Sequence, residues 1–302
     1  MNKKLVIPMH FLIETVCGKC NATCNMCLIK KAPRNEIMNN ETFTKILKRI
    51  KPYLDYQKFL SFCGLGETLI DKEIDKKIKI AKETGFHGIG VYTNGMLLNA
   101  GMSEKLLEAS LDSLIISIDG FSSAAQESIR KGTKLGRIIK NIDDFISIRE
   151  SNNIKTKIII RFHRQSINYN EWNDFYGFWN KRLKNNFSDS IACYDVHNIG
   201  GNISFANANI EGLESNKKLP KCNQIYERLQ IFSDGSVGLC CGDVLGRINI
   251  GNVLYDDPIK LYNSGHFAKY REYMENGKIL DLKLCKECTV PYSTTNKNIM
   301  NV

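Results

Sequence analysis

Short apolar runs alternate with amphipathic stretches through the first two thirds of the chain, and this alternation predicts its secondary structure. The apolar runs predict β-strands at residues 58–65, 88–95, 111–120, 155–163 and 189–198. The stretches between them predict helices at residues 70–85, 103–110, 135–151 and 170–183. Gly85 is expected to end the first of these helices and Ser103 to cap the second. Such βα repetition favours a parallel sheet with its catalytic groups at the carboxyl ends of the strands.

Beyond residue 203 the pattern changes, which indicates a second and smaller unit. Residues 228–241 are typical of a β-hairpin that turns at Asp234-Gly235, and residues 269–277 are typical of a helix. We therefore expect a first domain at residues 1–203, a polar linker at 204–221, a second domain at 222–295 and a frayed tail at 296–302.

The composition of the 302-residue chain is that of an ordinary globular protein, with 43% hydrophobic and 25% charged residues. The first residues do not form a secretory signal, because their apolar stretch is short and is interrupted by Pro8 and His10. No run approaches the roughly 18 apolar residues that span a bilayer. We therefore expect a cytoplasmic protein that does not engage a membrane.

The formal net charge of +10 allows an anionic partner. The lysines are spread through helical patterns and do not form a dense basic tract with interleaved aromatic residues. Nucleic acid is therefore not an expected partner, whereas a phosphorylated or nucleotide-linked small molecule stays open.

Eleven cysteines fall into two main groups, one near each end of the chain. In a reducing compartment such clusters indicate metal binding or catalysis more than disulfides. The first group is CGKCNATCNMC at residues 17–27. Four cysteines in two pairs can bind one zinc ion, although such pairs are usually further apart. Alternatively, Cys20, Cys24 and Cys27 bind an iron–sulfur cluster with one iron left open, and Cys17 is spare.

The Cys20-x3-Cys24-x2-Cys27 spacing resembles the signature of the radical S-adenosylmethionine (radical SAM) enzymes. Three later segments resemble further motifs of that family in the same order: FCGLGETLI at residues 62–70, VYTNG at 91–95 and SIDG at 117–120. Thr68 replaces a proline that the family usually has, and Met26 stands where an aromatic residue is common. The resemblance implies a partial (β/α)6 TIM-like barrel with SAM on the open iron. It also implies SAM contacts from Gly64, Gly66, Glu67, Asn94, Ser117 and Asp119.

The second cysteine group lies in the last third of the chain. Its spacing alone permits a zinc ribbon. Beside the barrel motifs it resembles the SPASM extension, in its shorter twitch form. The resemblance implies a small hairpin-plus-helix domain that binds an auxiliary 4Fe–4S cluster through Cys222, Cys240, Cys285 and Cys288. Cys241 is then either a small buried side chain or a hydrogen-atom donor to a substrate radical.

Two 4Fe–4S clusters with SAM favour a net oxidation of a small polar substrate such as a sugar, a cyclitol or a nucleotide-linked molecule, as in the aminocyclitol dehydrogenase type of butirosin biosynthesis. Arg161 and His197, at predicted strand ends, are candidate catalytic residues beside Cys241. An electron donor such as flavodoxin or ferredoxin is expected. The alternatives are a peptide-modifying radical SAM enzyme, such as an epimerase or a crosslinking maturase, and a non-redox zinc scaffold. We expect no leader-binding domain ahead of residue 12, which disfavours the peptide-modifying alternative.

Overall fold

The computed structural model describes residues 5–183, 187–203, 221–293 and 299–301. Its centre is one sheet in the order β12-β11-β1-β5-β6-β7-β9-β10-β13. The strands are β1 (His10–Ile13), β5 (Phe59–Phe62), β6 (Ile89–Thr93), β7 (Ser113–Ser117), β9 (Lys157–Arg164), β10 (Ser190–Asp195), β11 (Arg228–Ile231), β12 (Val237–Gly238) and β13 (Ile299–Asn301). From β11 to β10 every neighbouring pair is parallel. The mixed α/β barrel-like class that the sequence predicts is therefore confirmed.

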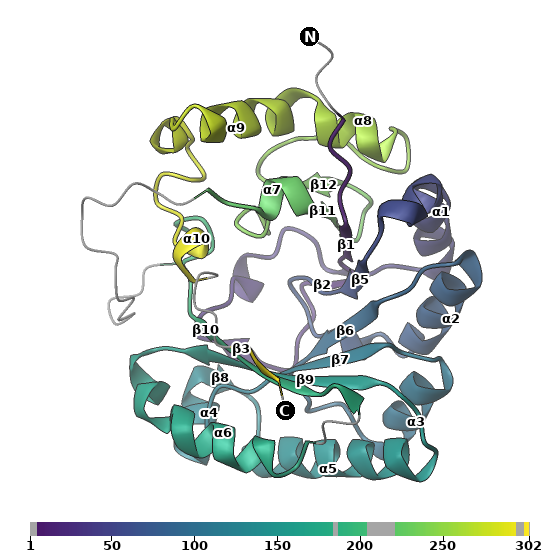
Figure 1. Cartoon of the computed structure of the whole chain (residues 1–302), viewed down its shortest axis with the longest axis vertical. Helices are drawn as coiled ribbons and strands as arrows, with labels where there is room; N and C mark the ends of the chain where they lie inside the picture. Colours follow the sequence, from purple (N-terminus) through teal and green to yellow (C-terminus); the bar gives the residue numbers. More distant parts are fainter. Residues whose placement is uncertain (1–4, 184–186, 204–220, 294–298, 302) are drawn as a thin grey trace.

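Helices cover the outer face of this curved sheet (Figure 1). They are α1 (Asn40–Ile50), α2 (Ile74–Thr84), α3 (Ala100–Glu108), α4 (Ser123–Ile129), α5 (Leu135–Ser151) and α6 (Trp172–Asn180). The last third of the chain adds α7 (Gln224–Glu227), α8 (Pro258–Asn263), α9 (Gly265–Glu275) and α10 (Val290–Ser293). Buried apolar side chains between the helices and the sheet form one large core. None of the described helices is long and apolar enough to cross a membrane.

Four helix starts differ from the sequence prediction. Helix α6 begins at Trp172 and not at residue 170, and α9 begins at Gly265 and not at residue 269. Helix α2 begins at Ile74, four residues later than predicted, because Thr68–Ile70 form a separate turn of 3-10 helix. Helix α3 is capped by Asn99, whose side chain accepts a hydrogen bond from the Met102 amide, so the prediction that Ser103 caps it is wrong. Ser103 lies inside the helix and is fully buried. Gly85 does end α2, in the left-handed conformation that suits glycine.

The C-terminal hairpin belongs to the same sheet as the barrel. Strands β11 and β12 are antiparallel and turn at Asp234-Gly235 as predicted, but β11 also pairs in parallel with β1. The tail differs from the expectation as well. Ile299–Asn301 form strand β13, which pairs antiparallel with β10, because the edge of β10 offers unpaired backbone groups. The predicted linker at 204–221 lies outside the described residues except for Lys221.

Candidate active site and auxiliary cysteine site

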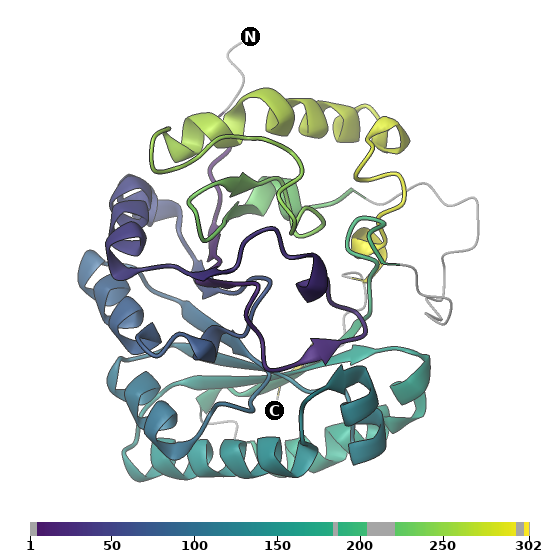
Figure 2. The ribbon, with the colours of Figure 1, turned by 180° about the vertical axis from the view of Figure 1, so that it is seen from behind.

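The first cysteine group sits on a long loop that crosses the inner side of the sheet (Figure 2). Two small antiparallel pairs hold this loop: β2 (Val16–Cys17) with β4 (Glu36–Ile37), and β3 (Thr23–Cys24) with β8 (Arg130–Lys131). Backbone contacts add to these pairs, since the Gly18 amide donates to the Leu65 carbonyl at 2.8 Å. Gly18 has a φ of +73°, and a Cβ there would lie 2.4 Å from the Arg34 carbonyl oxygen, so glycine is required.

A cavity of about 280 Å³ opens beside this loop. We call it the reaction cavity. Most of the site residues predicted from the sequence line it, namely Cys20, Cys24, Cys27, Gly64, Gly66, Glu67, Asn94, Ser117, Arg161 and His197. The cavity also takes in Met26 and further residues that sequence reasoning did not assign to the site, among them Cys63, Tyr92, Arg130 and His163. Cys17 is fully buried in β2 and does not line it.

The three cavity-lining thiols of the first group are buried enough that burial raises the pKa of each above its ordinary value, for Cys20 to about 11. A cluster of iron and sulfide therefore has to displace thiol protons when it binds. Thiolates are the ligands that such clusters prefer. The space beside the thiols is edged by Gly64 and Gly66, where backbone can approach a ligand closely. A Cβ on Gly66 would lie 2.6 Å from the Val16 carbonyl oxygen. The donor set thus fits an iron–sulfur cluster with a chelating ligand.

Glu67 is a buried carboxylate that is fixed before any ligand binds. One oxygen accepts hydrogen bonds from the Thr93 hydroxyl at 2.6 Å and the Leu69 amide at 3.1 Å, and the other accepts from the Asn94 amide at 2.8 Å. Burial raises the pKa of Glu67, and these three donors offset part of that effect. The carboxylate is oriented at the cavity wall, where it can receive an amine.

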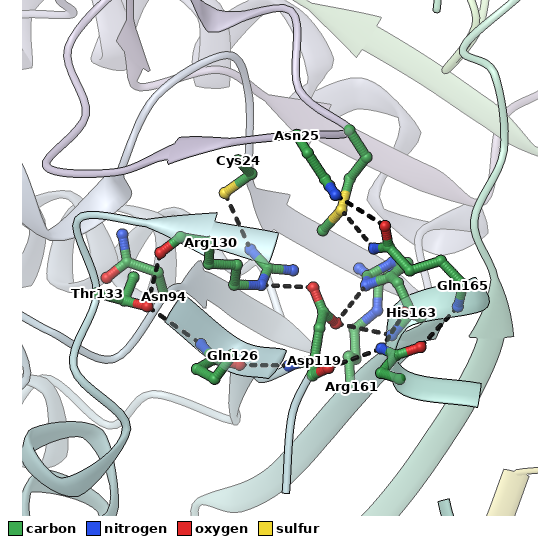
Figure 3. A network of polar contacts seen from close by, with 12 residues as sticks. Cys24, Asn25, Asn94, Asp119, Gln126, Arg130, Thr133, Arg161, His163 and Gln165 are labelled. Carbon is green, nitrogen blue, oxygen red and sulfur yellow. Dashed lines mark hydrogen bonds and ion pairs between the residues drawn. The ribbon is translucent and has the colours of Figure 1, made fainter. Parts of the chain in front are cut away.

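Asp119 does not line the reaction cavity but lies behind its wall, where it organises a polar network (Figure 3). One carboxylate oxygen accepts from Arg130 Nε at 2.6 Å and the other from the His163 amide at 2.7 Å. Burial alone would raise the pKa of Asp119, but Arg130 and His163 outweigh it and hold that pKa at about 2. Arg130 in turn places Nη1 3.7 Å from Cys24 Sγ. Asp119 therefore acts on the cavity through two side chains that do line it.

Hydrogen bonds define which nitrogen of each cavity histidine carries the proton. His163 Nδ1 lies 3.3 Å from the Asp119 carboxylate, so it is the protonated nitrogen, and Nε2 accepts from Arg161 Nη2 at 3.2 Å. His197 is reversed, because its Nδ1 accepts from the Ile199 amide at 3.3 Å and Nε2 carries the proton. Burial lowers the pKa of both histidines, for His197 to about 4, so both are neutral at pH 7.

The second cysteine group surrounds its own small cavity of about 20 Å³, which we call the auxiliary cavity. Its cysteines are Cys222, Cys240, Cys241, Cys285 and Cys288. Burial raises the pKa of all five thiols, and most also feel the charge of another cysteine of the group. The predicted ligands are therefore brought together, and their thiols fit an iron–sulfur cluster. Cys241 lies with them and not in the reaction cavity, and among the described residues no three metal-binding side chains converge on a single-ion site.

A short segment at residues 197–200 joins the two cavities. His197 and Ile199 line the reaction cavity. The Asn198 backbone amide donates to the Thr289 hydroxyl at 2.9 Å, and the Asn198 side-chain oxygen accepts from the Thr289 amide at 3.0 Å, next to Cys288. The segment at residues 197–200, which follows β10, is thus hydrogen-bonded to the segment that carries Cys288 and Thr289.

Residues 15–160 match the radical SAM superfamily, and residues 222–289 match SPASM, an iron–sulfur cluster-binding domain. The chain belongs to the radical SAM superfamily and carries a SPASM domain, so it is a radical SAM enzyme whose cofactors are SAM and two iron–sulfur clusters.

Among curated proteins, the GTP 3′,8-cyclase of Clostridium botulinum is 32% identical over 172 residues, which are 55% of this chain and 51% of that protein. A tungsten-containing aldehyde ferredoxin oxidoreductase cofactor-modifying protein of Pyrococcus furiosus is 29% identical over 117 residues, 38% of this chain and 32% of that one. This chain thus spans about half the length of the cyclase and a third of the second relative.

Solved structures with a similar fold include BtrN in complex with AdoMet and 2-DOIA, at a TM-score of 0.62 and 16% identity over 93% of both chains. Another is anSMEcpe with AdoMet and the Cp18Cys peptide, at a TM-score of 0.65 and 16% identity over 98% of this chain and 93% of that one. SuiB of Streptococcus suis with S-adenosylmethionine has a TM-score of 0.65 and 17% identity over 94% of this chain and 72% of that one. At these identities the likeness concerns the fold.

Proposed function

We propose that this enzyme is an oxidoreductase that removes two hydrogens from an alcohol or amine carbon of a small polar substrate, such as a sugar or cyclitol. The observation that carries the proposal is the pairing of the reaction cavity with a second cysteine cavity through residues 197–200. When bound, SAM at the first cluster supplies a radical that takes a hydrogen atom, and the auxiliary cluster takes an electron. Removal of two hydrogens releases a hydrogen atom, an electron and a proton. The proton has to be accepted by a side chain of the protein itself.

His163 is the proposed proton acceptor. Its Nε2 lone pair accepts a hydrogen bond from Arg161, so this bond has to be released before Nε2 takes a proton. Because Nδ1 faces Asp119, the proton then gives an imidazolium beside a carboxylate. The low pKa of Asp119, about 2, keeps that carboxylate charged at working pH. His197 presents Nε2–H in its neutral form, so its proposed role is to donate a hydrogen bond to a substrate oxygen.

The proposed substrate size follows from a solved structure that this chain matches over nearly its full length. The BtrN structure holds the small molecule 2-DOIA, and 93% of each chain is covered. An electron donor such as flavodoxin or ferredoxin would supply the electron that starts each SAM cleavage. Cys285 and Cys288 lie with Cys222 and Cys240 around one cavity, which suits an auxiliary cluster closed by four protein thiolates and therefore limited to electron transfer.

The proposal is tested by anaerobic incubation of the cluster-loaded enzyme with reductant, SAM and a panel of sugars, cyclitols and hydroxy acids. We expect one compound to yield 5′-deoxyadenosine and a product about two mass units lighter, in equal amounts. Unchanged mass with deuterium uptake from solvent would assign the enzyme to epimerisation. Turnover of a peptide, with none of the small molecules oxidised, would favour the peptide-modifying alternative.

A further inference from the structure

Arg161 is the charged group of the reaction cavity that has no carboxylate partner among the described residues. The other two charged side chains of the lining are committed, since Arg130 pairs with Asp119 and Glu67 accepts three hydrogen bonds. Arg161 instead lies near the rings of Tyr194 and Tyr92, with its Cζ 4.9 and 5.4 Å from their centroids. Its Nε is buried without a hydrogen-bond partner in the described part of the chain.

The surroundings of Arg161 fix its direction without neutralising it. His163 Nε2 accepts one guanidinium hydrogen bond at 3.2 Å, and the backbone carbonyl of Arg161 is held by the Ile118 amide. Aromatic faces attract a cation but leave its charge available to a ligand. The partial burial of a cation in a cavity wall costs free energy unless an anion pairs with that cation.

We propose that Arg161 binds a carboxylate of the substrate, so that the molecule oxidised here is a hydroxy acid or amino acid, such as a sugar acid. The oxidation step in this inference rests on the proposed function, whereas the binding of a carboxylate by Arg161 does not. One guanidinium balances one negative charge, which suits a carboxylate better than a phosphate dianion that needs several donors. The proposal also narrows the substrate from any small polar molecule to one that carries a carboxylate.

SAM has a carboxylate too. Arg130 pairs with Asp119 through Nε, but its Nη1 end faces the first cysteine group and is left to meet the carboxylate of SAM. Arg130 is the guanidinium in contact with a cysteine of the first group, with Nη1 3.7 Å from Cys24 Sγ. Arg130 is on β8, which pairs with β3 of the cysteine loop, whereas Arg161 stands on β9 of the main sheet, near Tyr194 and the two histidines. The two arginines therefore divide the cavity into a SAM side and a substrate side.

The test measures anaerobic binding to the cluster-loaded enzyme saturated with SAM and without reductant, so that no turnover occurs. The probes are acid and amide pairs: lactate with lactamide, mandelate with mandelamide and gluconate with gluconamide. We expect at least one acid to bind about tenfold to a hundredfold more tightly than its amide. Arg161→Gln should abolish that difference, and Arg161→Lys should keep part of it.

Arg164→Gln is the matched control, because Arg164 lies on the same strand but is already paired with Asp195 at 2.8 Å. It should keep the acid preference, and both Gln variants should bind SAM as the wild type does. The proposal is wrong if no acid binds better than its amide, if glucose 6-phosphate is preferred to glucuronate, or if Arg161→Gln weakens SAM binding. Acid-specific binding without any oxidation would overturn the proposed reaction and leave the carboxylate site standing.

Discussion

The three cavity thiols and Cys17 are chemically alike but stand in different surroundings. Cys20, Cys24 and Cys27 reach the reaction cavity, whereas Cys17 is fully buried in β2 and contacts Leu28 and Leu65. Burial raises the pKa of Cys17 to about 12, which keeps it a neutral thiol. The two Cys-x2-Cys pairs in the sequence thus divide into three cavity-lining thiols and one core residue.

Alanine at Cys20 should remove the first cluster and abolish SAM cleavage, because the cluster loses a thiolate. Alanine at Cys17 should keep the first cluster and SAM cleavage, and it should lower the unfolding free energy by about 1–2 kcal/mol. Iron and sulfide analysis with 5′-deoxyadenosine formation measures each outcome. Loss of the first cluster in Cys17→Ala, with retention in Cys20→Ala, would refute this reading of the motif.

His163 predicts the pH dependence of oxidation. Burial lowers its pKa from the ordinary value of 6.5, and neutral imidazole is the form that accepts a proton. The rate should therefore be full above that lowered pKa and fall as the pH drops through it. In Asp119→Asn the falling limb should move to lower pH, because Asp119 is a group that raises the pKa of His163.

The matched measurement is the pH profile of product formation in His163→Gln. This variant should lose the acid limb together with most of the rate, while SAM binding persists. An unchanged profile would remove His163 from the proton transfer.

At the scale of elements, local periodicity was enough to place the parallel strands β5, β6, β7, β9 and β10 and to set both ends of α5. Local periodicity could not predict how distant segments pair with one another. The sequence of residues 228–231 does not indicate that β11 pairs with β1, because the register depends on partners more than 200 residues away. His163 and Arg130 were missed as site residues for the same reason, since only the fold brings them beside Asp119 and Cys24.

The cap of α3 gives a direct test at this scale. Asn99→Ala should cost about 1 kcal/mol of unfolding free energy, because it removes the hydrogen bond to the Met102 amide. Ser103→Ala should be close to neutral, because the Ser103 hydroxyl is buried without a partner in the described residues. Chemical denaturation compares the two variants, and a larger loss in Ser103→Ala would contradict the observed cap.

At the scale of the molecule, Glu14 ties three distant segments together. Its carboxylate pairs with Arg34 of the cysteine loop at 3.1 Å, accepts from the Leu65 amide at 2.9 Å, and lies 3.4 Å from the Ser233 amide after β11. Arg34 also stacks over Phe232 at 4.1 Å. The loop of the first cysteine group and the hairpin that leads to the second are thereby fixed to one buried charge.

Glu14→Gln should destabilise the fold by about 3 kcal/mol, because it leaves Arg34 buried without its countercharge. Glu41→Gln is the control, since its pair with Lys45 is exposed and the change should cost less than about 0.5 kcal/mol. Denaturation of the cluster-free proteins measures both. Equal losses would mean that Glu14 does not join the segments energetically.

The central claim is that the two cavities serve one oxidation, and Cys288→Ala tests it most directly. The measurement is 5′-deoxyadenosine and oxidised product from the same anaerobic reaction, for the wild type and for this variant. The wild type should contain about eight irons and form the two products in equal amounts. The variant should contain about four irons and still form 5′-deoxyadenosine while oxidised product is lost. Oxidised product at the wild-type rate in a variant without the auxiliary cluster would contradict the claim.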